Sequence, residues 1–330
     1  MVDRMAQQIY EQYRGALMGL AVGDALGAPF EGLSRGTFGP VEGMAGGGPH
    51  KLEPGQWTGN TSLALCLAAS LTERRGFDPR DQMDRYLRWK NEGYMSSTGR
   101  AFGMGSTLGK ALRRYEETGR YEETGDPCAG PADLLTAGSG SLVRLAPIPM
   151  YMCLDGSRAK ELAAAMSRTT HAAEEAVDAC RYLTGLMVGA FRGESKEVLF
   201  SDHYSPVYHY WFFPQIKLAR KVSAIAAGSY KRKEAEDLPA SGYVIDTLEA
   251  ALWCFWRTES FREGSLLAVG LGGCAGTTAA VYGQLAGAYY GVDAIPGEWR
   301  ETVAQGRMIE ELAASLLEAT RQGIRHLSAI

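Results

Sequence analysis

The sequence lacks the usual signatures of a structural metal site or a disulfide framework. Its six cysteines include no C-x-x-C pair, and the five histidines show no metal-ligand spacing. Three of the cysteines, Cys66, Cys180 and Cys254, lie within apolar helical patterns. We therefore expect reduced, mostly buried thiols in a cytoplasmic protein.

A basic excess and a long apolar run are also missing. The net charge is -4 and no basic stripe appears, so nucleic acid is not expected as a partner. The longest apolar run near the start, residues 16–28, is interrupted by Asp24 and is too short to cross a bilayer. No signal-peptide pattern precedes it. We predict no membrane partner.

Strand-like alternation is absent, and the helical period dominates. Residues 10–27, for example, place Tyr10, Tyr13 and Leu17 on one face. Turn-rich connectors lie at 31–56, 119–141 and 193–206. Helices are predicted at 10–27, 61–74, 80–91, 158–168, 172–192, 207–228, 245–257, 260–269, 277–290 and 301–326. Because no composition shift divides the chain, we predict an all-α fold with one domain over residues 1–330.

Two of the predicted helices carry glycine stripes. In the first, residues 15, 19, 23 and 27 are glycines, and in the second residues 283, 287 and 291 are. Each glycine costs about 1 kcal/mol relative to alanine inside a helix. Such stripes are typical of helices whose backbones approach closely. We predict that these two helices form the tightly packed centre.

Two carboxylates stand out near the end of the first glycine-striped helix. Asp24 lies within the apolar pattern, and Glu31 follows just beyond it. A carboxylate in an apolar setting is costly unless it is paired or hydrogen-bonded. Asp24 therefore either caps a neighbouring helix, pairs with a buried arginine, or serves a function.

Two further segments combine small and polar residues at predicted helix starts. In "WTGNTS", Thr58 and Asn60 suit helix capping. In "GGCAGTT", Cys274, Gly276 and Thr277 precede a long small-residue helix. A helix N-terminus without acidic side chains can bind an anion through its free N–H groups. Cys274 at that position is a candidate for a lowered pKa.

A Gly-Ser loop and one histidine complete the candidate site. Ser139, Gly140 and Ser141, with Arg144 nearby, suit a phosphate or a sugar hydroxyl, although such loops are also ordinary turns. His171 follows two threonines at a predicted helix start. It suits stacking on a base, holding a ribose hydroxyl, or a structural role.

Taken together, these segments resemble the ADP-ribosylglycohydrolase family, which includes dinitrogenase reductase-activating glycohydrolase and the ADP-ribosyl-acceptor hydrolases. The resemblance is carried by "GALMGLAVGDALGAPFEG", "RTTHAAEEAVDACRYLTGLMVGA", "SGYVIDTLEAALWCFWRTESFREGSLLAVGLGG" and "TTAAVYGQLAGAYYG". It implies one compact all-α domain with a central cleft. It also implies two Mg²⁺ ions and cleavage of the glycosidic bond between ADP-ribose and an acceptor such as arginine or serine.

The sequence departs from the family at the metal motifs. The family's Trp-Thr-Asp-Asp-Thr is Trp-Thr-Gly-Asn-Thr at residues 57–61, and its Asp-x-Asp-Thr is Cys-Ala-Gly-Thr at residues 274–277. Its Gly-Asn-Gly is Gly-Ser-Gly at residues 138–140. Mg²⁺ prefers carboxylate oxygens, and a thiol is a poor ligand for it. We therefore predict no magnesium centre and no other cofactor. A zinc site at Cys274 has no second thiol or nearby histidine to support it.

These departures lead to two hypotheses. The first is a metal-independent glycosidase, or related enzyme, acting on an ADP-ribosyl, NAD-derived or other ribosyl nucleotide, with small-molecule biosynthesis as one version. Glycosidic cleavage requires a carboxylate, and Glu31 and Asp24 are the catalytic candidates. The second is an inactive ADP-ribose-binding or structural protein. The predicted substrate-binding residues are Thr58, Asn60, Ser139, Gly140, Ser141, His171, Cys274, Gly276 and Thr277.

Overall fold

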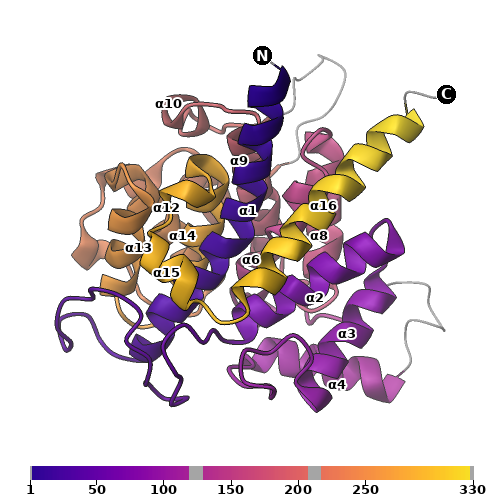
Figure 1. Cartoon of the computed structure of the whole chain (residues 1–330). Coiled ribbons are helices and arrows are strands. Elements are labelled where there is room, and N and C mark those ends of the chain that lie inside the picture. The colour runs from indigo at the N-terminus through magenta and orange to yellow at the C-terminus, as the bar shows by residue number, and fades with distance from the viewer. Residues whose placement is uncertain (1, 119–128, 207–216, 328–330) are drawn as a thin grey trace.

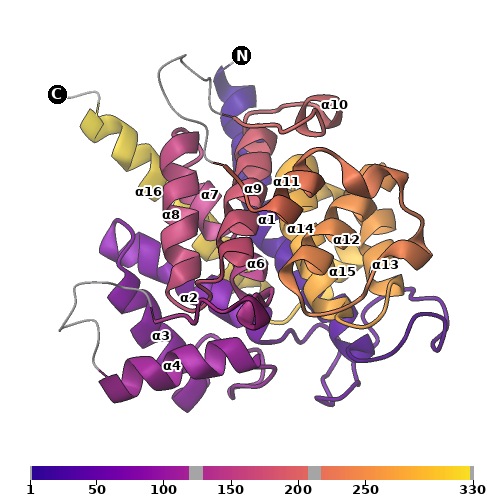
Figure 2. The ribbon, with the colours of Figure 1, turned by 180° about the vertical axis from the view of Figure 1, so that it is seen from behind.

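The computed structural model describes residues 2–118, 129–206 and 217–327, and these residues form an all-α fold (Figures 1 and 2). Within these ranges, extended backbone pairs only at the isolated bridges Gly47–Leu52 and Gly138–Tyr243. The predicted fold class is therefore confirmed. A search of the same residues finds no helix with the length and apolar character needed to span a membrane.

The α-helices follow one another along the chain with short 3₁₀ turns between some of them. They are α1 (Val2–Gly27), α2 (Gly59–Arg74), α3 (Pro79–Glu92), α4 (Ser106–Thr118), α6 (Gly140–Val143), α7 (Pro147–Tyr151), α8 (Gly156–Arg168), α9 (Glu174–Phe191), α10 (Lys196–Leu199), α11 (Arg220–Ala226), α12 (Val244–Arg257), α13 (Phe261–Gly270), α14 (Ala275–Tyr290), α15 (Gly297–Thr302) and α16 (Gly306–Leu327). The 3₁₀ turns are η1 (Ala28–Phe30), η2 (Leu134–Thr136), η3 (Ser229–Arg232), η4 (Ala235–Asp237) and η5 (Val292–Ala294).

The centre of the molecule is the antiparallel pair α1 and α14, which make the most extensive helix–helix contact and lie side by side in Figure 1. A Cβ added at Gly19 would collide with the carbonyl group of Gly283, and one at Gly287 would collide with that of Gly15. No side chain fits between these backbones. The close approach predicted from the two glycine stripes is confirmed.

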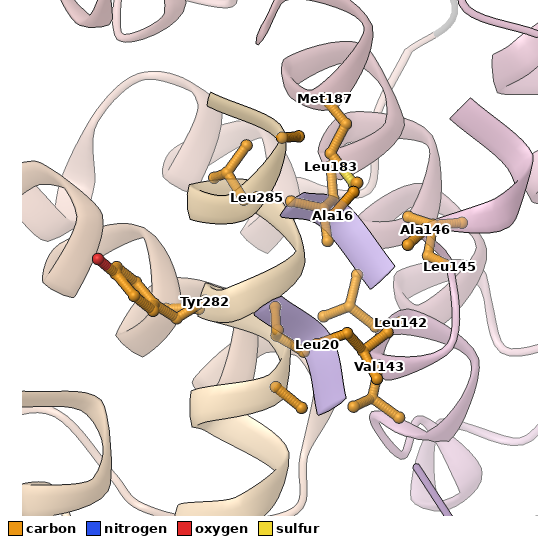
Figure 3. Close-up of a cluster of buried hydrophobic side chains, with 14 of the residues drawn as sticks. Ala16, Leu20, Leu142, Val143, Leu145, Ala146, Leu183, Met187, Tyr282 and Leu285 are labelled. Atoms are coloured by element: carbon orange, nitrogen blue, oxygen red, sulfur yellow. The ribbon is translucent and has the colours of Figure 1, made fainter. Parts of the chain in front are cut away.

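The short helix α6 is held firmly in this core. Leu142 and Val143 of α6 pack among side chains of α1, α9 and α14, as Figure 3 shows. The amide of Gln284, on α14, donates hydrogen bonds to the carbonyl oxygens of both residues, at 3.1 and 3.3 Å. Because these bonds reach carbonyl groups at the C-terminal end of this four-residue helix, they tie α6 to α14.

Most of the predicted helices are present, with shifted ends. The helix predicted at 301–326 is wrong in one respect, because the chain leaves helical geometry between Thr302 and Gly306. Gln305 there has a left-handed φ of 56°. A carbonyl group in this break binds the segment before α2, because the Trp57 indole N–H donates to the carbonyl oxygen of Ala304 at 2.9 Å. The interruption therefore anchors that segment.

Other segments also differ from the prediction, and the short helices α6, α7 and α10 were not predicted. The helix expected at 207–228 is described only from residue 217 onward, where α11 covers Arg220–Ala226, and residues 207–216 lie outside the described residues. Helix α4 was not predicted. Its apolar residues Leu108 and Leu112 pack in a small satellite core with α2 and α3, and this contact stabilises a helix whose exposed face is strongly polar.

Candidate functional site

Three helix ends meet at one end of the α1–α14 pair. Because the two helices run antiparallel, the C-terminus of α1 lies at the N-terminus of α14, where a Cβ on Gly27 would sit 2.5 Å from the Cα of Gly276. The N-terminus of α2 joins them through Asp24. Residues far apart in the sequence are brought together here by the packing of two glycine-striped helices.

Asp24 is completely buried and caps α2. It accepts hydrogen bonds from the backbone N–H and hydroxyl of Thr58, both at 2.9 Å, and from those of Thr61 at 3.1 and 2.8 Å. The Asn60 amide donates a fifth, at 3.1 Å. Burial raises the pKa of Asp24, and the bonds from the two threonines oppose that shift. Of the three alternatives for Asp24, the structure shows the helix cap.

Glu31 has a different environment. It follows η1 and is partly buried, and one carboxylate oxygen accepts a hydrogen bond from the backbone N–H of Gly276 at 3.1 Å. Its side chain also hydrogen-bonds with the thiol of Cys274. Burial raises the pKa of Glu31 to about 7, the charge of Asp24 adds to the shift, and the Gly276 and Cys274 bonds oppose it. This carboxyl group changes protonation state near neutral pH.

One backbone N–H at the N-terminus of α14, that of Gly276, therefore bonds to a side chain of the same chain. The prediction that this terminus can bind an anion of the substrate remains a prediction. The lowered pKa suggested for Cys274 is wrong. Burial and the neighbouring Glu31 carboxylate raise the pKa of the Cys274 thiol to about 12. The thiol is protonated at neutral pH and is a weak nucleophile.

Asn60 links two of the predicted motifs. Its amide donates to Asp24 and, at 3.4 Å, to the hydroxyl of Thr277. Its backbone N–H donates to the Thr58 hydroxyl at 3.2 Å, which caps α2 as predicted. The structure thus brings together Asp24, Glu31, Thr58, Asn60, Cys274, Gly276 and Thr277.

The remaining predicted residues form a second cluster around the loop before α6. The His171 ring lies against Gly140, where an added Cβ would be 2.9 Å from Nε2. Ser141 is fully buried, and its hydroxyl oxygen accepts hydrogen bonds from Ser167 at 2.8 Å and from the Cys180 thiol at 3.5 Å. No face of Ser141 is open to a ligand, so its predicted substrate-binding role is wrong and its role is to join α6, α8 and α9.

The segment before α12 connects the two clusters. The Ser139 N–H donates to the carbonyl oxygen of Gly242 at 3.1 Å, and the Cys274 N–H donates to that of Ala240 at 3.1 Å. A Cβ on Gly242 would lie 3.5 Å from the Cys274 sulfur. The Ser139 loop and the Glu31 region are therefore neighbouring parts of one candidate site.

Sequence reasoning missed several residues of this site. Thr61 donates two of the five hydrogen bonds to Asp24. Trp89 fills the space beside Gly59, where an added Cβ would be 2.8 Å from the indole ring. The Thr-x-x-Thr spacing of "TGNT" was a usable signal for Thr61, because Thr58 is the N-cap of α2 and Thr61 lies in its first turn. No local pattern pointed to Trp89, which comes from α3.

Two surface cavities flank the loop that follows Glu31. One, of about 440 Å³, is lined by Arg35, Phe38 and residues of α13. The other, of about 510 Å³, is lined by Phe30 and residues 40–45. Neither is lined by a predicted site residue. The lining of the second includes Phe30, the residue before Glu31.

The capping aspartate, the titratable glutamate and the Gly-Ser loop lie together on an all-α scaffold, and comparison with known proteins gives the family. The model of the ADP-ribosylglycohydrolase family matches residues 5–325. The chain belongs to this family.

Individual relatives cover most of the chain. It is 38% identical over 306 residues to the protein named ADP-ribosylarginine hydrolase Tri1 of Serratia proteamaculans, covering 93% of this chain and 79% of that protein. It is 28% identical to ADP-ribosyl-[dinitrogen reductase] glycohydrolase of Rhodospirillum rubrum, covering 88% and 90%. A solved structure titled ADP-ribosylglycohydrolase-related protein complex is similar with a TM-score of 0.79 and 43% identity, covering 95% of this chain and 99% of that one.

Proposed function

We propose that this protein hydrolyses the N-glycosyl bond of an ADP-ribosyl group without a binuclear magnesium centre, and that Glu31 is the catalytic carboxylate. The observation that carries the proposal is the contrast in hydrogen bonding between the two site carboxylates. Asp24 is saturated by five donors, whereas Glu31 is partly exposed and has a pKa raised to about 7. A general base works best with a pKa near the working pH.

ADP-ribosylarginine is the first substrate to test, because relatives at 37–38% identity carry the name ADP-ribosylarginine hydrolase. Its guanidinium group is cationic. Cleavage of the bond from the ribose anomeric carbon to nitrogen gives that electron pair to the guanidine and neutralises it. This leaving group needs no acid. A carboxylate that activates water is therefore sufficient.

In the proposed step, ionised Glu31 accepts a proton from a water molecule as the water oxygen attacks the anomeric carbon. The carbon–nitrogen bond breaks, and the products are ADP-ribose and a neutral guanidine. The proton held on Glu31 then passes to the guanidine, which restores both charges. The positive end of α14 and the Gly276 N–H keep the carboxylate in place for this transfer. Asp24 acts as a positioning residue that fixes the start of α2.

The residues at the family's metal-binding positions support a site without magnesium. Where the family has its paired carboxylates, this chain offers two glycines, one amide and one thiol at residues 59, 276, 60 and 274. The space beside Gly59 is filled by Trp89, so a larger side chain would displace that ring. Among the described residues, no group of three or more His, Cys, Asp or Glu side chains is placed to hold a metal ion.

The same observations favour one second candidate, an ADP-ribose-binding protein without turnover. The loss of every carboxylate at those positions removes the chemistry that the family resemblance implies. Under either candidate we propose a cytoplasmic location, supported by the free thiols of the described cysteines, Cys66, Cys153, Cys180, Cys254 and Cys274.

The proposal is tested by measuring release of arginine from ADP-ribosylarginine in EDTA, with NAD and nicotinamide mononucleotide as parallel substrates. Glu31→Gln keeps the size of the side chain and removes the base, and we expect a loss of about 100-fold or more in kcat. Glu42→Gln, an exposed change in the loop after Glu31, is the matched control. ADP-ribose binding without product supports the second candidate, and turnover only with Mg²⁺ refutes the metal-free site.

A further inference from the structure

Among the residues that the structure describes, the buried cation Arg144 has no acidic partner. Its side chain is fully buried at the end of α6. Its polar partners include the carbonyl oxygen of Gly140 at 3.1 Å and the hydroxyl groups of Thr170 and Tyr86, and the Tyr86 ring centroid is 4.9 Å away. A buried charge without a counterion is expensive. Its placement beside the Ser139 loop therefore calls for an explanation beyond packing.

The hydroxyl of Thr170 links Arg144 to His171. Its oxygen accepts from the Arg144 guanidinium and lies 2.8 Å from Nδ1 of His171. Thr170 is fully buried, so its hydroxyl proton needs an acceptor nearby. The guanidinium has only donors, which leaves Nδ1 of His171 as the acceptor. Nδ1 then carries no proton, and the neutral ring holds its proton on Nε2.

The positive charge of Arg144 also favours a neutral His171 ring. Burial, together with the nearby Arg144 cation, lowers the pKa of His171 to about 3. A ring with both nitrogens protonated would place a second buried positive charge beside the first. His171 is therefore neutral throughout the physiological pH range.

The protonated edge of the ring faces the candidate site. Added Cβ atoms at Gly138 and Gly140 would lie 3.7 and 2.9 Å from Nε2, so this nitrogen lies along the side of the loop that has no side chains. Both glycines are partly exposed, although His171 itself is only 3% exposed. A group bound against this loop meets an N–H donor. Such a donor suits the oxygen atoms of a ribose or a diphosphate.

We propose that Arg144 and Thr170 act as positioning residues that lock His171 as an Nε2–H donor toward the ligand bound at the Ser139–Gly140 loop. The ligand part of this inference rests on the proposed function, whereas the locked tautomer does not. The consequence is that the ring donates to the ligand as a neutral Nε2–H group even as the pH falls toward 5. An ordinary histidine would become charged in that range.

The tautomer is measured directly by long-range proton–nitrogen correlation NMR on protein labelled with ¹⁵N-histidine. The signals of His171 are assigned by their loss in His171→Gln. We expect one neutral Nε2–H form from pH 5 to pH 8 in the parent protein. An Nδ1–H form, or a ring that becomes charged in this range, would overturn the proposal whatever the activity.

Thr170→Val removes the link while keeping the shape of the side chain. We expect His171 to lose its exclusive Nε2–H form, and the dissociation constant for ADP-ribose to rise about tenfold, as for the loss of one well-placed hydrogen bond. Thr170→Ser retains the hydroxyl and should restore both properties. An unchanged tautomer in Thr170→Val would also overturn the proposal.

Thr169→Val is the matched control for a lost buried hydroxyl. The Thr169 hydroxyl donates to the Met166 carbonyl and accepts from Gln82, so its hydrogen bonds go to residues other than His171. We expect this variant to lose some stability and to keep the parent tautomer. If the tautomer is as expected but ADP-ribose does not bind the parent protein, the proposed function fails while the locked tautomer stands.

Discussion

Asp24 and Glu31 lie seven residues apart at the same end of α1, and their surroundings differ sharply. Asp24 is buried and accepts five hydrogen bonds, all from the start of α2. Glu31 is partly exposed and is held by one backbone N–H and one thiol. The difference separates two uses of a carboxylate. A saturated carboxylate fixes structure, and one with free lone pairs and a raised pKa can exchange a proton.

The largest effect should come from Asp24→Ala. It leaves two backbone N–H groups and three side-chain donors without an acceptor, and we expect the free energy of unfolding to fall by about 3 kcal/mol or more. Urea denaturation measures this. Asp155, an exposed aspartate that caps α8, provides the control, because Asp155→Ala should cost only about 1 kcal/mol. Equal losses for the two variants would contradict the structural role of Asp24.

The next effect concerns the helix pair that positions both carboxylates. Gly19→Ala places a methyl group against the Gly283 carbonyl and should cost about 1–3 kcal/mol of unfolding free energy. It should also lower turnover, because the ends of α1 and α14 move apart. In the control Gly270→Ala, the methyl group meets no atom within 4 Å and should be neutral or stabilising. A stable Gly19→Ala would contradict the close packing.

A third effect is a pH-dependent change in stability for Glu31→Gln. The folded state raises the pKa of Glu31 from its ordinary value of 4.5 to about 7, so folding is penalised once the group must ionise. This penalty is absent below pH 4.5, grows as the pH rises, and is complete above pH 7. Glu31→Gln removes it.

We therefore expect Glu31→Gln and the parent protein to have similar unfolding free energies at pH 4, and the variant to be about 1–3 kcal/mol more stable at pH 8. Denaturant titrations at both pH values measure the difference. Asp24→Asn should instead be less stable than the parent protein at both pH values, because an amide oxygen cannot accept all five hydrogen bonds made to Asp24. A variant that loses stability at pH 8 would mean that Glu31 is held as a favourable ion.

The smallest effect should come from Cys274→Ala. The thiol is a weak donor to Glu31, and its removal should raise the pKa of Glu31 by less than about one unit. Turnover at pH 8 should change little, because the thiol does not act as a nucleophile. The pH dependence of kcat/KM measures both. Complete loss of turnover would show that Cys274 takes part in the chemistry.

The sequence allowed much of the scaffold to be predicted. Glycines four residues apart identified the α1–α14 contact, because only close backbones require them. The helical period located most other helices. The break around Gln305 was not predictable, since it is stabilised by a hydrogen bond from Trp57 to Ala304, 247 positions away. Long-range hydrogen bonds leave no local pattern.

The sequence predicted which residues belong to the candidate site better than it predicted what each of them does. The residues of the predicted motifs do lie close together in the structure. In the sequence, however, Asp24 was as good a catalytic candidate as Glu31. Only the three-dimensional arrangement of α2 shows that its donors saturate Asp24. In the same way, Ser141 looked like part of an open loop and is buried between three helices. Burial of a polar side chain depends on packing that the sequence does not display.

The central claim is that Glu31, without metal, is the base of an ADP-ribosyl hydrolase. The pH dependence of kcat/KM for ADP-ribosylarginine, measured in EDTA, tests it most directly. We predict turnover that rises with pH through one ionisation near pH 7, and that is lost in Glu31→Gln. Turnover that appears only with added Mg²⁺, or a profile that Glu31→Gln leaves unchanged, would contradict it.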